Sequence, residues 1–60
     1  MGKNIKDLTE AIRLNPNDAF AYAIRGDAYR IIGEHETAIK DFYEAIRLDP
    51  NIISRLYPRK

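Results

Sequence analysis

The chain of 60 residues contains no cysteine and no tryptophan, and it has only one histidine and one serine. Without cysteine it can form neither a disulfide nor a thiolate site, which favours a reducing, cytoplasmic location. No apolar run approaches the roughly 20 residues that a membrane span needs. The net charge of +1 is too small to attract nucleic acid over a distance. Composition therefore predicts a protein with no membrane and no nucleic-acid partner.

Residues for chemistry are equally scarce. Ser54 and His35 are far apart in sequence, so a nucleophile and base pair is not expected. Glu34 and Glu36 flank His35, but consecutive side chains at a helix start point in different directions, and a metal site needs three or four converging ligands. We expect no enzyme activity, no cofactor and no metal. The aromatic residues have helical spacing, which indicates core positions rather than platforms for stacked bases.

What the chain does contain is an internal repeat. Residues 4–17 return 34 positions later as residues 38–51, and ten of the fourteen positions are identical. A fixed period of this length is typical of stacked helical units, each of which buries its apolar face against its neighbours. Such strong identity is typical of recent duplication or of design. Function then depends on surfaces.

Helix signals divide the chain into three stretches. Apolar residues at helical spacing predict helices over about 3–15, 18–32 and 35–48. Pro16 and Pro50 end the first and third, and Gly33 supplies a left-handed cap for the second. Asn17 or Asp18 caps the start of the second helix. The fold class is all-α: three antiparallel helices in one domain (residues 1–60), with a C-terminal turn and frayed tail over 53–60.

The second predicted helix has apolar residues on most of its surface, so it must contact more than one neighbour. Gly26 in its middle costs about 1 kcal/mol relative to Ala, which suggests close approach of another helix. A mixed stripe remains that neither flanking helix would cover: Phe20, Ala23, Asp27, Arg30 and Ile31. The expected core is Tyr22, Ile24, Ala28, Tyr29, Ala38, Phe42, Ala45 and Ile46, with Leu8 and Ile12 packing on the second helix.

These residues resemble the tetratricopeptide repeat family. Its signature positions over residues 19–52 are matched by Tyr22, Gly26, Tyr29, Gly33, Ala38, Phe42, Ala45 and Pro50. Residues 4–18 resemble the second half of a preceding unit. Arg25 departs from the usual Leu, which its aliphatic stem can replace by snorkelling, and His35 departs from a common Tyr.

The resemblance implies a helical-hairpin repeat whose first helices line a concave surface that binds peptides or partner proteins. It places the stripe of Phe20, Ala23, Asp27, Arg30 and Ile31 on that surface. Family members that clamp terminal carboxylates use Lys and Asn where this chain has Ala23 and Asp27, so that clamp is absent. A peptide or partner-helix groove on the second helix is therefore one interpretation.

The other interpretation is self-association. A repeat and a half has little core, and the family normally stacks about three units. Copies are expected to pair through unpaired apolar residues, most simply as a two-fold dimer, by docking or by exchange of helices, with open head-to-tail stacking as the competing geometry. The residues expected at that contact are Ile39, Tyr43, Ile46, Ile52, Ile53, Leu56 and Tyr57.

Overall fold

In the computed structural model, which describes residues 4–58, the chain folds into four helices. They are α1 (Ile5–Leu14), α2 (Ala19–Ile31), α3 (His35–Leu48) and α4 (Ile52–Leu56). No strand occurs within this range, so the all-α prediction is confirmed. The helix predicted over 35–48 has the predicted bounds, and the other two are shorter than predicted by one or two residues at each end. Lys3, included in the first of these predictions, lies outside the described residues.

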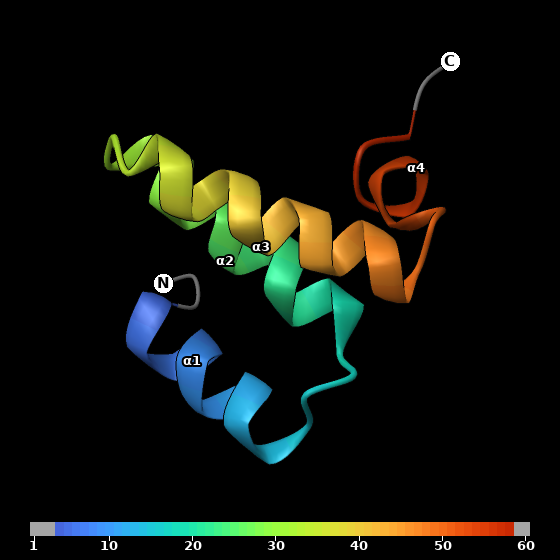
Figure 1. Cartoon of the computed structure of the whole chain (residues 1–60), viewed down its shortest axis with the longest axis horizontal. Helices are drawn as coiled ribbons and strands as arrows, with labels where there is room; N and C mark the ends of the chain where they lie inside the picture. The colour runs from blue at the N-terminus through green and yellow to red at the C-terminus, as the bar shows by residue number, and fades with distance from the viewer. Residues whose placement is uncertain (1–3, 59–60) are drawn as a thin grey trace.

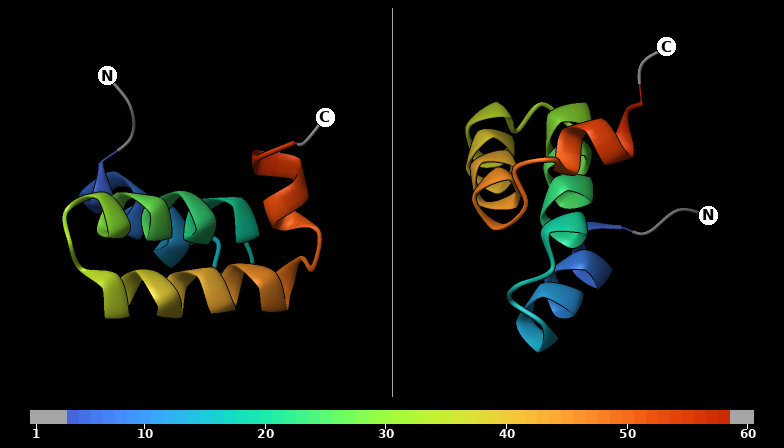
Figure 2. Two further views of the ribbon diagram at one scale, coloured as in Figure 1. Left: turned by 90° about the horizontal axis from the view of Figure 1, so that it is seen from above. Right: turned by 90° about the vertical axis from the view of Figure 1, so that its right-hand side faces the viewer.

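Helix α2 lies at the centre of the molecule (Figure 1). Helix α3 runs antiparallel beside it, and α1 packs on α2 from another side, as both views in Figure 2 show. The short α4 crosses the end of this pair and contacts both α2 and α3. The short C-terminal turn predicted after the third helix is the five-residue helix α4. The segment forms a helix because its apolar side chains can dock.

Local side-chain chemistry explains where α1 and α2 start. The side chain of Asn4 accepts a hydrogen bond from the Asp7 amide at 2.8 Å, and that of Asp18 accepts one from the Ala21 amide at 3.1 Å. These bonds satisfy amides that have no partner inside the first turn of a helix. The prediction of a cap at Asn17 or Asp18 is thereby resolved in favour of Asp18.

Gly33 ends α2 in the left-handed conformation, with φ of 90°. The Glu34 amide donates to the Tyr29 carbonyl at 2.9 Å, and the Gly33 amide donates to the Arg30 carbonyl at 3.1 Å. This pair of bonds is the Schellman motif, which uses up carbonyls that the helix leaves free. The turn between α2 and α3 is therefore tight, and it sets the two helices side by side.

The core consists of two small clusters that share Tyr22. One joins α1 to α2 through Leu8, Ile12 and Ala21, and the other joins α2, α3 and α4 through Ala23, Ala45 and Ile52. Of the predicted core, Leu8, Ile12, Ala38 and Ala45 are buried. Five more predicted members are half-buried: Tyr22, Ile24, Ala28, Tyr29 and Phe42.

Ile46 was predicted as core, and this is wrong, since its side chain is 41% exposed. Its repeat equivalent Ile12 is 8% exposed because α2 lies against that side of α1. Among residues 4–58, no helix covers the corresponding side of α3. The close approach predicted at Gly26 is confirmed, since an added Cβ would lie 3.2 Å from the Ala38 carbonyl oxygen and 3.3 Å from Phe42 Cδ2.

Candidate interaction surfaces

The outer face of α3 is an apolar surface that no other helix covers in the described part of the chain. Ile39 is 53% exposed and Tyr43 is 72% exposed, with Ile46 on the same side. Together with the half-buried Phe42 they line a hollow of about 340 Å³. We call these four residues the α3 outer face. Exposed apolar residues gathered on one helix side are typical of contact surfaces.

The internal repeat shows what a covered version of this face looks like. The equivalent residues on α1 are Ile5, Leu8, Thr9 and Ile12. Leu8 and Ile12 are buried there against Ala21, Tyr22 and Ile24 of α2. Two of the four differences between the repeats fall on this face, and both enlarge it: Phe42 replaces Leu8, and Tyr43 replaces Thr9. The larger, aromatic copy is the one left uncovered.

Charged side chains border the α3 outer face. Glu36, Lys40 and Arg47 are exposed along one edge, and Arg47 pairs with Glu44 one turn earlier. This hydrogen bond lowers the pKa of Glu44 and raises that of Arg47. The face therefore has an apolar centre and a polar rim, as protein interfaces do.

The concave stripe of α2 is only partly available. Ala23 was predicted to line a groove, and this is wrong: it is fully buried, because Ile52 of α4 packs on it. Phe20 (55% exposed) and Ile31 (69% exposed) remain open at the two ends of the stripe. Between them Arg30 pairs with Asp27 at 2.6 Å.

Helix α4 covers the middle of this stripe with residues that were expected to mediate self-association. Ile52 is 2% exposed, so for Ile52 that prediction is wrong, and Leu56 is half-buried in the same cluster. Ile53 and Tyr57 stay exposed at 39% and 46%. Burial raises the pKa of the Tyr57 hydroxyl, and the nearby Asp27 carboxylate raises it further, although Arg30 opposes this. Tyr57 therefore lies beside the ion pair of the stripe.

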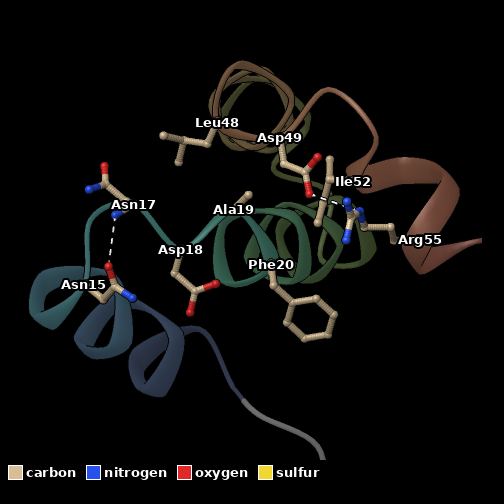
Figure 3. A pocket seen from close by; sticks show the side chains of 9 residues that line it. All are labelled: Asn15, Asn17, Asp18, Ala19, Phe20, Leu48, Asp49, Ile52 and Arg55. Carbon is tan, nitrogen blue, oxygen red and sulfur yellow. Dashed lines mark hydrogen bonds and ion pairs between the residues drawn. The ribbon is translucent and has the colours of Figure 1, made fainter.

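A polar hollow of about 570 Å³ lies at the end of the molecule where the loop between α1 and α2 lies near the loop between α3 and α4 (Figure 3). Arg55 pairs with Asp49 at 3.3 Å across it, and Phe20 projects at its rim. The Asn15 side chain accepts from the Asn17 amide, and Asp49 accepts from the Asn51 amide in the repeat-equivalent turn. Asp49 and Arg55 are therefore already paired with each other, and Asp18 already accepts from the Ala21 amide as the cap of α2.

A buried ion pair joins α2 to α3 and was not predicted. Arg25 donates to both oxygens of Asp41 at 2.8 Å, and its third contact is the Thr9 hydroxyl of α1 at 3.2 Å. The guanidinium also lies 5.7 Å from the ring of Tyr22 and 5.8 Å from that of Tyr29. The hydrogen bond to Asp41 raises the pKa of Arg25 despite its burial.

A signal for this pair was present in the sequence. Asp41 lies on the same side of its helix as Ala38 and Ala45, where a carboxylate requires a cationic partner. Arg25 is the departure from the family pattern on the facing helix, so the two residues explain each other. Arg25 was expected to snorkel, with its charged end in solvent. This is wrong, because its side chain is only 17% exposed and its guanidinium is paired with Asp41.

The structure does not bring His35 and Ser54 together. His35 opens α3 and Ser54 follows its far end, and a helix of this length separates them by about 20 Å. Among residues 4–58 no group of three or more His, Cys, Asp or Glu side chains is placed to hold a metal ion. No helix in the same range has the length and apolar character to cross a bilayer. Arg59 and Lys60, two of the three basic residues near the C-terminus, lie outside the described residues.

Comparison with known proteins agrees with this architecture. A model of the tetratricopeptide repeat matches residues 19–52, which comprise α2, α3 and the start of α4. No curated protein and no solved structure is significantly similar to the chain. Since the match covers more than half of the 60 residues, the chain belongs to the tetratricopeptide repeat family, whose members form protein–protein interaction modules.

Proposed function

We propose that this protein is a non-catalytic interaction module that self-associates through the α3 outer face. The observation that carries the proposal is the exposure of Ile39, Tyr43 and Ile46 on one side of a helix whose repeat equivalent buries Leu8 and Ile12 against α2. Covering these side chains removes apolar area from water, at about 25 cal/mol per Å². Ile53 of α4 and Tyr57, which follows this helix, are exposed as well.

The size of the face sets the expected affinity. Stable interfaces bury about 800 Å² on each partner, and one face of a 14-residue helix is smaller than this. We therefore expect a weak dimer, with a dissociation constant of about 10 µM to 1 mM. Such an equilibrium can be shifted by a single substitution.

Sedimentation equilibrium over a hundredfold concentration range tests the proposal. The mass should rise from that of the 7.0 kDa chain towards twice that value. Tyr43→Thr introduces the residue that the chain itself carries at Thr9, so helix α3 should tolerate it, and the dissociation constant should increase about tenfold or more. Leu14→Lys is the matched control, because Leu14 is 70% exposed and lies on α1. A 7.0 kDa species at every concentration would refute self-association.

A second candidate is recognition of a peptide or partner helix by the open residues of the concave stripe. The exposure of Phe20 and Ile31 on either side of the Asp27–Arg30 pair favours it. Binding there should depend little on salt, because one Arg opposed by one Asp produces a weak field. A ligand found by titration whose affinity survives the double change Phe20→Ala with Arg30→Ala would exclude this stripe.

A further inference from the structure

We infer that the occupant of the α3 outer face is α3 of a second copy, in antiparallel orientation about a two-fold axis between Phe42 and Tyr43. This inference rests on the proposed self-association and specifies its geometry. Three observations lead to it: the order of the residues along α3, the charges on one edge, and the two differences from α1.

The apolar residues form a pattern that is the same in both directions. Along α3 the order is Ile39, two adjacent aromatic residues, and Ile46, with a spacing of three, one and three positions. At 100° per residue all four lie on one side of the helix. When a second α3 runs antiparallel across it, Ile39 meets Ile46 of the second copy, and Phe42 meets Tyr43. An isologous contact requires this kind of self-complementary patch.

The charged edge distinguishes antiparallel from parallel pairing. Glu36 and Arg47 are eleven positions apart, which is three turns, so they lie on the same edge of α3. An antiparallel partner brings Glu36 of one copy towards Arg47 of the other at both ends of the contact. In a parallel two-fold pair the same edges of the two copies lie on opposite sides of the contact, so Glu36 and Arg47 would not meet across it. Opposite charges that meet in only one orientation favour that orientation.

The enlarged face argues against simple continuation of the repeat. On α1 the smaller Leu8 and Thr9 accommodate α2, and Thr9 turns its hydroxyl to the Ile5 carbonyl at 2.8 Å. At the equivalent place α3 carries Tyr43, whose ring points to solvent. In a second copy the side of α2 that would cover α3 is already packed on its own α1. Helix α3 of the second copy is not obstructed in this way.

Disulfide trapping with introduced cysteines tests the orientation, and the chain has no cysteine of its own to interfere. Two single variants, Ile39→Cys and Ile46→Cys, are mixed and allowed to equilibrate in a thiol–disulfide buffer. In the antiparallel pair these two positions face each other. Two copies of position 39 are then offset by about 10 Å, whereas a disulfide needs Cβ atoms about 3.5–4.5 Å apart. The mixed disulfide should exceed the one-half share expected from random pairing, and both homodisulfides should be depleted.

The control pair is Lys6→Cys with Arg13→Cys, which has the same seven-residue spacing on exposed positions of α1. It should give the random share. Excess of both homodisulfides at positions 39 and 46 would show a parallel pair. Random shares at these positions would show that α3 meets some other element. Either result would overturn the inference. Sedimentation of the unsubstituted chain tests self-association separately from its geometry. A monomer refutes self-association itself, whereas a dimer without an excess of the mixed disulfide refutes only the antiparallel geometry.

Discussion

At the residue scale, Arg25 connects three helices through a single guanidinium. It contacts Thr9 on α1 and Asp41 on α3 while its own backbone belongs to α2. Asp41 is 7% exposed at its side chain, so it would be costly to leave without its partner. The pair lies in the packed interface next to Gly26, where the Asp41 Cβ is 3.3 Å from the position of an added Cβ. Its geometry therefore fixes the register of α3 along α2.

Removal of one partner should be far more harmful than removal of both. Arg25→Leu leaves a buried carboxylate and should lower the free energy of unfolding by about 3–5 kcal/mol, which would unfold much of so small a domain. The double variant with Asp41→Leu should recover most of this loss. Urea or thermal unfolding followed by circular dichroism measures the stability of the parent chain, the two single variants and the double variant.

The internal repeat supplies a control for this comparison of single and double variants. Asp7 is the repeat equivalent of Asp41, and it is exposed on α1. Asp7→Ala should change stability by no more than about 0.5 kcal/mol. If Asp41→Ala in the presence of Arg25 were equally mild, the buried pair would contribute nothing and the register argument would be wrong.

Tyr57 gives the docking of α4 a dependence on alkaline pH. Its pKa is raised in the folded state, first by burial and then by Asp27. A raised pKa means that the stabilisation is complete below the unfolded value, near 10, and is lost as pH rises through the folded value. We expect the docking of α4 to weaken as the pH rises above about 10, as reported by the NMR signals of the Ile52 methyl groups. In Tyr57→Phe this part of the pH dependence should disappear, while the titration of other groups remains.

At the scale of elements, α4 decides which surfaces are open. Its Ile52 covers Ala23 and its Leu56 completes the same cluster, so the centre of the concave stripe belongs to the core. Pro58 follows soon after and cannot continue a helix. The helix therefore covers the concave side of α2, but it is too short to reach along the α3 outer face.

Adjacent residues of α4 should differ sharply on truncation. Ile52→Ala removes a side chain that is 2% exposed and should cost about 2–4 kcal/mol, with exchange protection lost in α4 first. Ile53→Ala removes one that is 39% exposed and should cost less than about 1 kcal/mol. Equal effects of the two changes would mean that α4 does not dock in solution.

At the scale of the whole molecule, the amount of core limits stability. The two clusters contain few fully buried side chains, and none is large and completely covered in the described part of the chain. A chain of this size is normally near the limit at which a single hydrophobic core suffices. Association through the α3 outer face would therefore stabilise the folded state by mass action.

The melting temperature should rise with protein concentration. A dimer that forms only from folded chains couples the two equilibria, so dilution favours unfolding. Calorimetry over a hundredfold concentration range should show an increase of several degrees for the parent chain and a nearly constant value for Tyr43→Thr. A constant melting temperature for the parent chain would show that the monomer core is sufficient by itself.

Several features could be predicted from the sequence because they depend on neighbours along the chain. Helix positions follow from apolar spacing, and the ends follow from Asp18, Gly33 and the prolines. The family follows from a period of 34 residues and from side chains at fixed places within it. These features depend on residues that are close together in the sequence, and the internal repeat contains part of the pattern twice.

Only the tertiary structure decided which of the apolar residues are covered. Ile12 and Ile46 occupy the same repeat position, but α2 lies against the first, whereas no helix in the described part of the chain covers the second. Ala23 is buried because α4 folds back on it, although its stripe was expected to be open. Asp41 and Asp7 are likewise equivalent in sequence, and the one that faces Arg25 is buried. Burial is a property of the pair of surfaces in contact, so identical segments acquire different roles when their neighbours differ.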